Sequence, residues 1–182
     1  MRVRKEVLFA GFGGQGVVLA AYILGRAVSL HEGRHAVQIQ SYGPEARGGA
    51  CSSSVVASDD PVDYPYARTP DVMVLMSRAA ADKYIGMAGP KTTVLYEEAL
   101  VPRPKVEGPC LPIPAVAIAE GLGSMMAVNV VMLGFLAGRT DVVSPDALRK
   151  AVLEAVPAKF HALNDRAFSA GMAHGKPLEV NS

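Results

Sequence analysis

The sequence predicts a three-layer α/β fold: a mainly parallel, Rossmann-like sheet flanked by helices, with helices alone at the C-terminal end. Short apolar runs alternate with segments of helical periodicity, which favours a parallel sheet. A glycine-rich loop, GFGGQG at residues 11–16, separates the first apolar run from the first helix. The run DVMVLMS at 71–77 is typical of a strand covered on both faces. At 182 residues, we expect a single domain over 1–182.

The first half of the chain supplies the glycine loop and its supports. Residues 6–10 predict a buried strand, and 15–30 predict a helix because their apolar residues recur at three- and four-residue spacing. A second strand is expected over 36–41 and another over 52–58, where small and β-branched residues dominate. The polar segment 42–49 between these two strands reads as a long functional loop.

The middle of the chain continues the alternation of strands and helices. After the strand at 71–77, we expect a short helix over 79–87 and a buried strand over 92–96. A proline-rich segment then leads to a short strand at 110–113 and a helix at 115–121. This order predicts parallel strands joined by helical crossovers.

Three helices are expected to complete the chain. The first runs over 124–136, with Ser124 as its N-cap and Gly138 as its stop. The second runs over 144–156 and begins with Ser-Pro-Asp, which combines a capping residue, a proline at the first position and an acid near the positive helix end. The third runs over 159–173.

Composition excludes several functional classes. Charged residues make up 19% and the formal net charge is +1, so no electrostatic footprint for nucleic acid or an anionic membrane is present. The most apolar later stretch, 125–137, is too short to span a bilayer, and we expect its central Asn129 to make a polar bond within the helix layer. Cys51 and Cys110 form no disulfide or metal pattern, which fits a cytoplasmic protein without a metal site.

The glycine loop admits three interpretations. Its glycines and the following helix could accept the phosphates of a dinucleotide, accept another phosphate, or form only a tight turn. A dinucleotide site should show an acid at the end of the second strand, whereas Gln38 and Gln40 occupy that region. Arg34 could bind the 2′-phosphate of NADP, but it precedes the second predicted strand. A free-standing NAD(P)- or FAD-binding oxidoreductase therefore stays an alternative, as does a purely structural subunit.

The second reactive segment is QSYGPEARGG at residues 40–49. Arg47 can bind phosphate or carboxylate in bidentate fashion, and the adjacent Gly48 and Gly49 would let a ligand or a partner backbone come close. Both this loop and the glycine loop follow strands, so they can line one crevice at the carboxyl ends of the sheet. The alternative is a surface pair of Arg47 and Glu45 that only stiffens the loop.

These segments together resemble the gamma subunit of 2-oxoacid:ferredoxin (acceptor) oxidoreductases. The order and spacing of GFGGQGVVLAAYILGRA, QSYGPEARGGACSSSVVASDDPVDYP and PDVMVLMS match that family. The wording SYGPEARGG looks most like the 2-oxoglutarate type, whereas pyruvate-type subunits more often have Arg-Gly-Ala-Pro at this place.

The resemblance implies a division of labour. In these enzymes thiamine diphosphate performs the decarboxylation, iron–sulfur clusters pass electrons to ferredoxin, and coenzyme A accepts the acyl group. This chain has no Gly-Asp-Gly thiamine motif and no cysteine cluster, so those cofactors are expected on alpha and beta subunits, with a delta subunit as a further option. The chain is then an accessory subunit, inactive alone and without catalytic residues of its own; self-association as a homodimer is left open.

The resemblance and the two loops together define the candidate site. Its residues are expected to contact the phosphates of coenzyme A or to close the active site at a subunit interface. The candidates are Gly11, Gly13, Gly14, Gln15, Gly16, Ser41, Tyr42, Glu45, Arg47, Gly48 and Gly49.

Overall fold

The structure, a computed structural model, describes residues 3–41, 49–66 and 68–175. Its first strand, β1 (Arg4–Phe12), is longer than the predicted strand and runs into the glycine loop. Helix α1 (Val17–Arg26) follows and ends in one wider, π-helical turn, η1 (Ala27–His31). Arg4–Phe12 supplies apolar residues to both faces of the sheet, because alternate residues of a strand point to opposite sides.

Strands β2 (His35–Ser41) and β3 (Ala50–Ser58) form a hairpin. β3 is antiparallel to both of its neighbours, β2 and β1, while the other pairings in the described sheet are parallel. The residues from 42 to 49 are too few for a crossover, since a parallel connection needs on the order of a dozen residues or more. This short connection explains why a mainly parallel sheet contains one reversed strand.

The described strands lie in the order β2-β3-β1-β4-β5-β6. The bounds of the last three are β4 (Val72–Leu75), β5 (Thr93–Glu97) and β6 (Cys110–Ile113). The strands that follow β1 in the sequence, β2 and β3, lie on one side of it, and β4 lies on its other side. The junction between β1 and β4 is therefore a topological switch point, where open α/β sheets form their ligand crevice.

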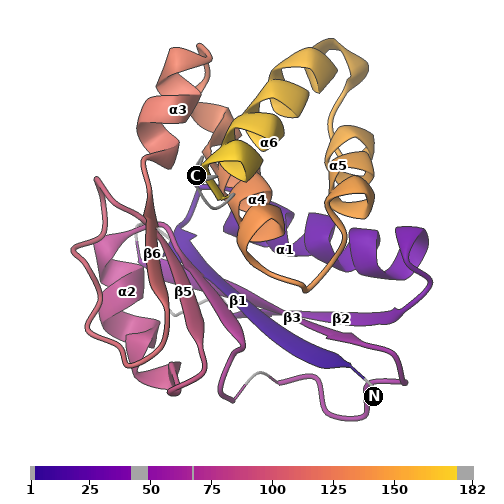
Figure 1. Ribbon diagram of the computed structural model, residues 1–182, viewed down its shortest axis with the longest axis vertical. Helices are drawn as coiled ribbons and strands as arrows, with labels where there is room; N and C mark the ends of the chain where they lie inside the picture. The colour runs from indigo at the N-terminus through magenta and orange to yellow at the C-terminus, as the bar shows by residue number, and fades with distance from the viewer. Residues whose placement is uncertain (1–2, 42–48, 67, 176–182) are drawn as a thin grey trace, which may run out of the picture.

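One short helix covers the second face of the sheet. Helix α2 (Arg78–Tyr84) begins at Ser77, whose side chain accepts a hydrogen bond from the backbone N–H of Ala80, and continues into the 3₁₀ turn η2 (Ile85–Met87). The helix packs on the apolar side chains that β1 and β4 direct to this face. Figure 1 shows α2 on one side of the sheet and α1, α4, α5 and α6 grouped on the other, which confirms the three layers.

The remaining helices form the thicker layer. Their bounds are α3 (Ala115–Gly121), η3 (Met125–Ala127), α4 (Val128–Arg139), α5 (Pro145–Glu154), η4 (Ala158–Phe160) and α6 (His161–Gly175). All residues of α4 from Val128 to Ala137 are buried, so this helix is the centre of the layer. Within the described ranges, no helix combines the length and apolarity needed to cross a membrane.

Two helix boundaries differ from the sequence prediction. Ser124 makes no side-chain capping bond; a 3₁₀ turn begins after it and α4 starts only at Val128. Gly138 does not stop α4, which continues to Arg139 before Thr140 takes an extended conformation. By contrast, Ser144 caps α5 as predicted, accepting from the backbone N–H of Ala147 at 3.4 Å.

Candidate functional site

The glycine loop lies at the carboxyl end of β1, next to the switch point of the sheet. Gly11 is still part of the strand, and the turn itself occupies residues 13–16 before α1 begins at Val17. The first turn of α1 has no acidic residue and its N-cap has no side-chain cap. The positive end of the helix dipole and its free N–H groups therefore remain available to an anion.

Glycine is required at two positions of this loop. Gly14 has φ +97° and Gly16 has φ +74°, a region that L-amino acids with a side chain rarely adopt. Among the described residues beyond its chain neighbours, no atom lies within 4 Å of the place that a Cβ would take on Gly13 or Gly14. Within the described ranges, no acceptor bonds the backbone N–H groups of these two residues. Both glycines are exposed, so a ligand can reach the backbone of the loop.

The side chain of Gln15 is turned inward instead. Its Oε1 accepts from the backbone N–H of Phe12 at 2.7 Å, and its Nε2 donates to the carbonyl oxygen of Met76 at 2.9 Å. A Cβ on Gly11 would lie 2.5 Å from that Oε1, so the glycine makes room for the amide. Of the predicted loop residues, Gln15 therefore braces the loop, and Gly13 and Gly14 face outward.

Asn129 is not among the predicted site residues, but its side chain contacts the glycine loop. Its Nδ2 donates to the carbonyl oxygen of Gly16, the N-cap residue of α1, at 3.4 Å, so Asn129 makes the predicted polar bond within the helix layer. A Cβ on Gly16 would collide with that amide. A single amide in the otherwise apolar core of α4 was the available signal, because a buried polar group needs a partner.

The second predicted segment returns to the same edge of the sheet. Ser41 is exposed at the end of β2 and pairs in register with Ser52, while Phe12 pairs with Ala50 at the start of β3. Gly49, directly before Ala50, is thereby brought beside the end of β1. Four further candidates, namely Tyr42, Glu45, Arg47 and Gly48, lie outside the described residues.

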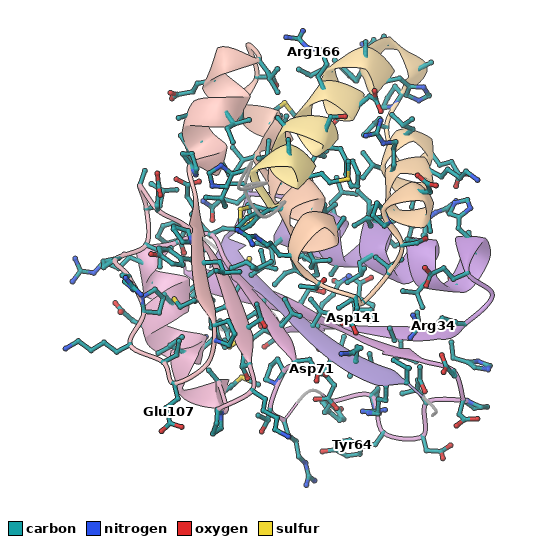
Figure 2. All side chains as sticks on the ribbon, in the orientation of Figure 1. Arg34, Tyr64, Asp71, Glu107, Asp141 and Arg166 are labelled. Carbon is teal, nitrogen blue, oxygen red and sulfur yellow. The ribbon has the colours of Figure 1, made fainter. Side chains whose placement is uncertain are left out.

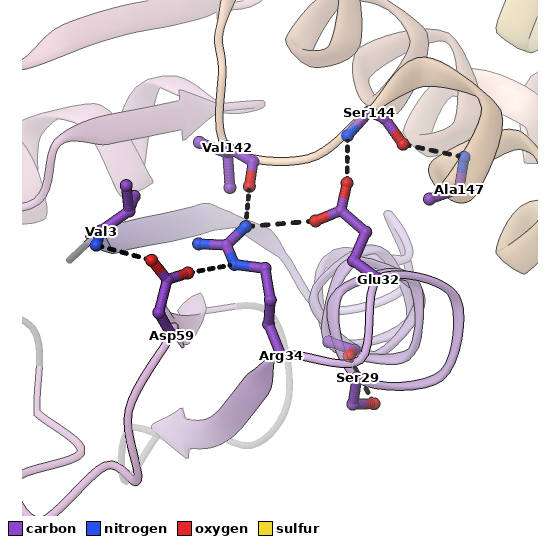
Figure 3. Close-up of polar contacts among 9 residues, drawn as sticks. Val3, Ser29, Glu32, Arg34, Asp59, Val142, Ser144 and Ala147 are labelled. Atoms are coloured by element: carbon purple, nitrogen blue, oxygen red, sulfur yellow. Dashed lines mark hydrogen bonds and ion pairs between the residues drawn. The ribbon is translucent and has the colours of Figure 1, made fainter. Parts of the chain in front are cut away.

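The groups that a dinucleotide ribose would need are occupied elsewhere. The Nε2 of Gln38 donates to the carbonyl oxygen of Val18 at 3.1 Å and to Ser53 Oγ at 2.9 Å, so this side chain ties β2 to α1 and β3. Arg34 donates to Asp59 at 2.9 Å and to Glu32 at 3.1 Å. Figure 3 shows its guanidinium enclosed between these carboxylates and the carbonyl oxygen of Val142.

Neither cysteine offers a reactive thiolate or a metal ligand set. Cys51 and Cys110 are free, and burial raises the pKa of both thiols. No group of three or more potential metal ligands occurs in the part of the chain that the structure describes. Two cysteines in the whole sequence are also too few for an iron–sulfur cluster, which takes four protein ligands.

The described residues also form hollows on the surface of the molecule. One of about 460 Å³ lies at the amino ends of β4 and β5, where Lys5 and Arg139 face Asp71 and Asp141. Figure 2 labels both aspartates, Asp71 beside the strands and Asp141 between the sheet and the helix layer. Another of about 410 Å³ lies on the sheet face beside α2, and its lining includes the predicted site residue Ser41 together with Gln40 and Ser52. Because ligands of open α/β sheets bind at the carboxyl ends of the strands, the 460 Å³ hollow is at the wrong end for the loop.

Comparison with known proteins agrees with this arrangement. The family model of pyruvate ferredoxin/flavodoxin oxidoreductases matches residues 6–174. The 2-oxoglutarate synthase subunit KorC of Methanocaldococcus jannaschii is 44% identical over 182 residues, which cover 98% of this chain and 97% of that subunit. The pyruvate synthase subunit PorC of Methanothermobacter thermautotrophicus is 31% identical over 180 residues, covering 97% and 98% of the two chains.

A solved structure is similar in both fold and sequence. The gamma subunit of a keto/oxoacid ferredoxin oxidoreductase from Geobacter sulfurreducens PCA superimposes with a TM-score of 0.85 at 36% identity, covering 94% of this chain and 98% of that one. The resemblance expected from the sequence is thereby confirmed, and the alternative of a free-standing dinucleotide-dependent enzyme is not supported. This chain belongs to the pyruvate ferredoxin/flavodoxin oxidoreductase family, as a gamma-type subunit of a 2-oxoacid:ferredoxin oxidoreductase.

Proposed function

We propose that this chain is the gamma subunit of an enzyme that oxidatively decarboxylates 2-oxoglutarate to its acyl-coenzyme A with electrons passed to ferredoxin. One observation supports the choice of substrate above the others. Identity to the subunit named for 2-oxoglutarate is 44% over nearly the full length of both chains, against 31% for the subunit named for pyruvate. The SYGPEARGG segment favours the same substrate.

The chemistry of the reaction belongs to partner subunits under this proposal. Thiamine diphosphate supplies the carbanion chemistry of decarboxylation, and iron–sulfur clusters supply the one-electron transfers. The described residues of this chain include no group of three or more potential metal ligands, and its two cysteines are too few to hold an iron–sulfur cluster. We therefore assign both cofactors to alpha and beta subunits and leave the presence of a delta subunit to the purified complex.

The role proposed for this chain is to bind the phosphates of coenzyme A. The start of α1 fits such a group, because Gly13 and Gly14 leave space for it and their N–H groups have no described acceptor. Backbone N–H groups at a helix N-terminus bind phosphate well. Arg47, which comes after β2 in the sequence, would add a bidentate contact to a phosphate of coenzyme A.

Purification from the native organism tests the assignment. We expect the chain to co-purify with thiamine- and cluster-binding subunits, and the complex to reduce ferredoxin with 2-oxoglutarate but only weakly with pyruvate. The isolated chain should show no such activity. A solitary chain that oxidises a 2-oxoacid would overturn the assignment, and a preference for pyruvate would overturn the substrate.

The coenzyme A contact has a separate test in the assembled enzyme. We expect Arg47→Ala to raise the KM for coenzyme A about tenfold, the usual size of one lost charged hydrogen bond, and to leave the KM for 2-oxoglutarate unchanged. Unchanged kinetics in a complex of unchanged size would remove Arg47 from the site.

A further inference from the structure

We propose that Gln15 and Asn129 are positioning residues, a two-amide clamp that holds the Gly13–Gly14 backbone open toward its phosphate ligand. The inference rests on the proposed function, because it needs the glycine loop to contact coenzyme A. It goes further in assigning the loop's shape to two side chains that do not touch the ligand.

Gln15 fixes the loop to the two strands that flank the switch point. Its amide accepts from Phe12 at the end of β1 and donates to Met76, directly after β4. The backbone N–H of Met76 in turn donates to the carbonyl oxygen of Ala10 at 2.8 Å. Because backbone hydrogen bonds already join these strand ends, the Gln15 amide holds the loop against them, and the lack of a side chain on Gly11 leaves room for it.

Asn129 fixes the other end of the loop to the helix layer. Its side chain is 4% exposed, and its Nδ2 donates to the Gly16 carbonyl oxygen. The same oxygen accepts from the backbone N–H of Ala20 at 2.8 Å, the first bond of α1. The start of α1 is therefore tied to α4, whose other residues around Asn129 are apolar and buried.

Between these anchors, the middle of the loop has no support from side chains. The Cβ positions of Gly13 and Gly14 are open among the described residues, and the turn over them is closed by the backbone N–H of Gln15, which donates to the carbonyl oxygen of Phe12 at 3.2 Å. A loop held in its binding conformation loses less entropy when the ligand arrives. Loosening either anchor should thus weaken binding of the phosphate and spare the chemistry, which takes place on partner subunits.

The test uses Gln15→Ala and Asn129→Leu in the assembled enzyme. Leucine keeps the branched shape of asparagine, so a buried apolar site tolerates it. We expect each variant to raise the KM for coenzyme A about tenfold, with kcat at saturating coenzyme A and the KM for 2-oxoglutarate unchanged. In Gln15→Ala, hydrogen exchange at the Phe12 amide should become faster, which a purely kinetic artefact would not produce.

Two further variants make the outcome decisive. Asn164→Leu removes a buried amide of α6 that donates to the carbonyl oxygen of Phe160 at 2.9 Å, and we expect no change in the KM for coenzyme A. Gly13→Asp places a negative charge at the open backbone and tests the ligand itself. If Gly13→Asp raises that KM while Gln15→Ala and Asn129→Leu do not, the clamp is refuted. If all three leave it unchanged, the proposed coenzyme A contact fails, and the clamp with it.

Discussion

The Asp59 carboxylate shows how one residue responds to its neighbours. Its pKa lies below the ordinary value because the backbone N–H of Val3 donates to it and because Arg34 bonds its other oxygen, while partial desolvation opposes the shift. A carboxyl group with a lowered pKa in the folded state stabilises the fold above its unfolded pKa. That contribution disappears as the pH falls through the folded pKa.

We therefore expect Asp59→Asn to lower the melting temperature at pH 7 and to have a steadily smaller effect below about pH 4, the ordinary range of an aspartate. Thermal unfolding of both proteins across this range measures the difference. Asp82→Asn is the matched control, since Asp82 is highly exposed and lies 3.8 Å from Arg78. A penalty for Asp59→Asn that stays constant into acid would contradict the assignment.

Other residues show which details of the site a sequence can give. Gly14 and Gly16 follow from the motif, because a tight turn before a helix needs positive φ. The inward turn of Gln15 does not, since its two partners depend on how β1 and β4 lie together. The residues around Arg47 remain a sequence prediction.

At the scale of elements, α4 and α6 make the tightest contact between helices. A Cβ on Gly134 would collide with the backbone carbonyl of Phe168, and a Cβ on Gly171 with that of Val131. The two glycines let the helix backbones approach each other closely. Helical periodicity predicts both helices, but which of their faces meet is decided only when they pack.

Gly171→Ala should therefore reduce the free energy of unfolding by about 1–3 kcal/mol, the usual cost of overpacking. Gly25→Ala in α1 provides the control, because nothing lies within 4 Å of its Cβ position. That variant should gain up to about 1 kcal/mol, since alanine is the better helix former. Urea denaturation measures both, and equal effects of the two substitutions would refute the close packing.

At the scale of the whole molecule, Arg34 connects segments that are distant in sequence. It bonds Glu32 and Asp59 and reaches the carbonyl oxygen of Val142 in the connection between α4 and α5. Glu32 continues the network by accepting from the backbone N–H of Ser144 at 2.7 Å. Arg34, whose side chain is 18% exposed, thus joins the edge of the sheet to the helix layer.

Arg34→Lys keeps the charge but loses the forked donor geometry. We expect it to cost about 1.5–3 kcal/mol, because charged hydrogen bonds in a half-buried site are lost. Arg78→Lys is the control and should change stability by less than about 1 kcal/mol, since Arg78 and its partner are exposed. Chemical denaturation of the two variants checks this; equal losses would mean that the Arg34 network adds no stability.

The sequence by itself determined the fold class, the order of strands and helices, the glycine loop and the family. Those features depend on local periodicity, turn chemistry and motif spacing, which are written along the chain. The tertiary structure alone decided that β3 lies between β2 and β1, that Gln15 bonds Met76 and that Asn129 bonds Gly16. Each of these depends on the distance between segments far apart in sequence, and only packing of the sheet against its helices fixes that distance.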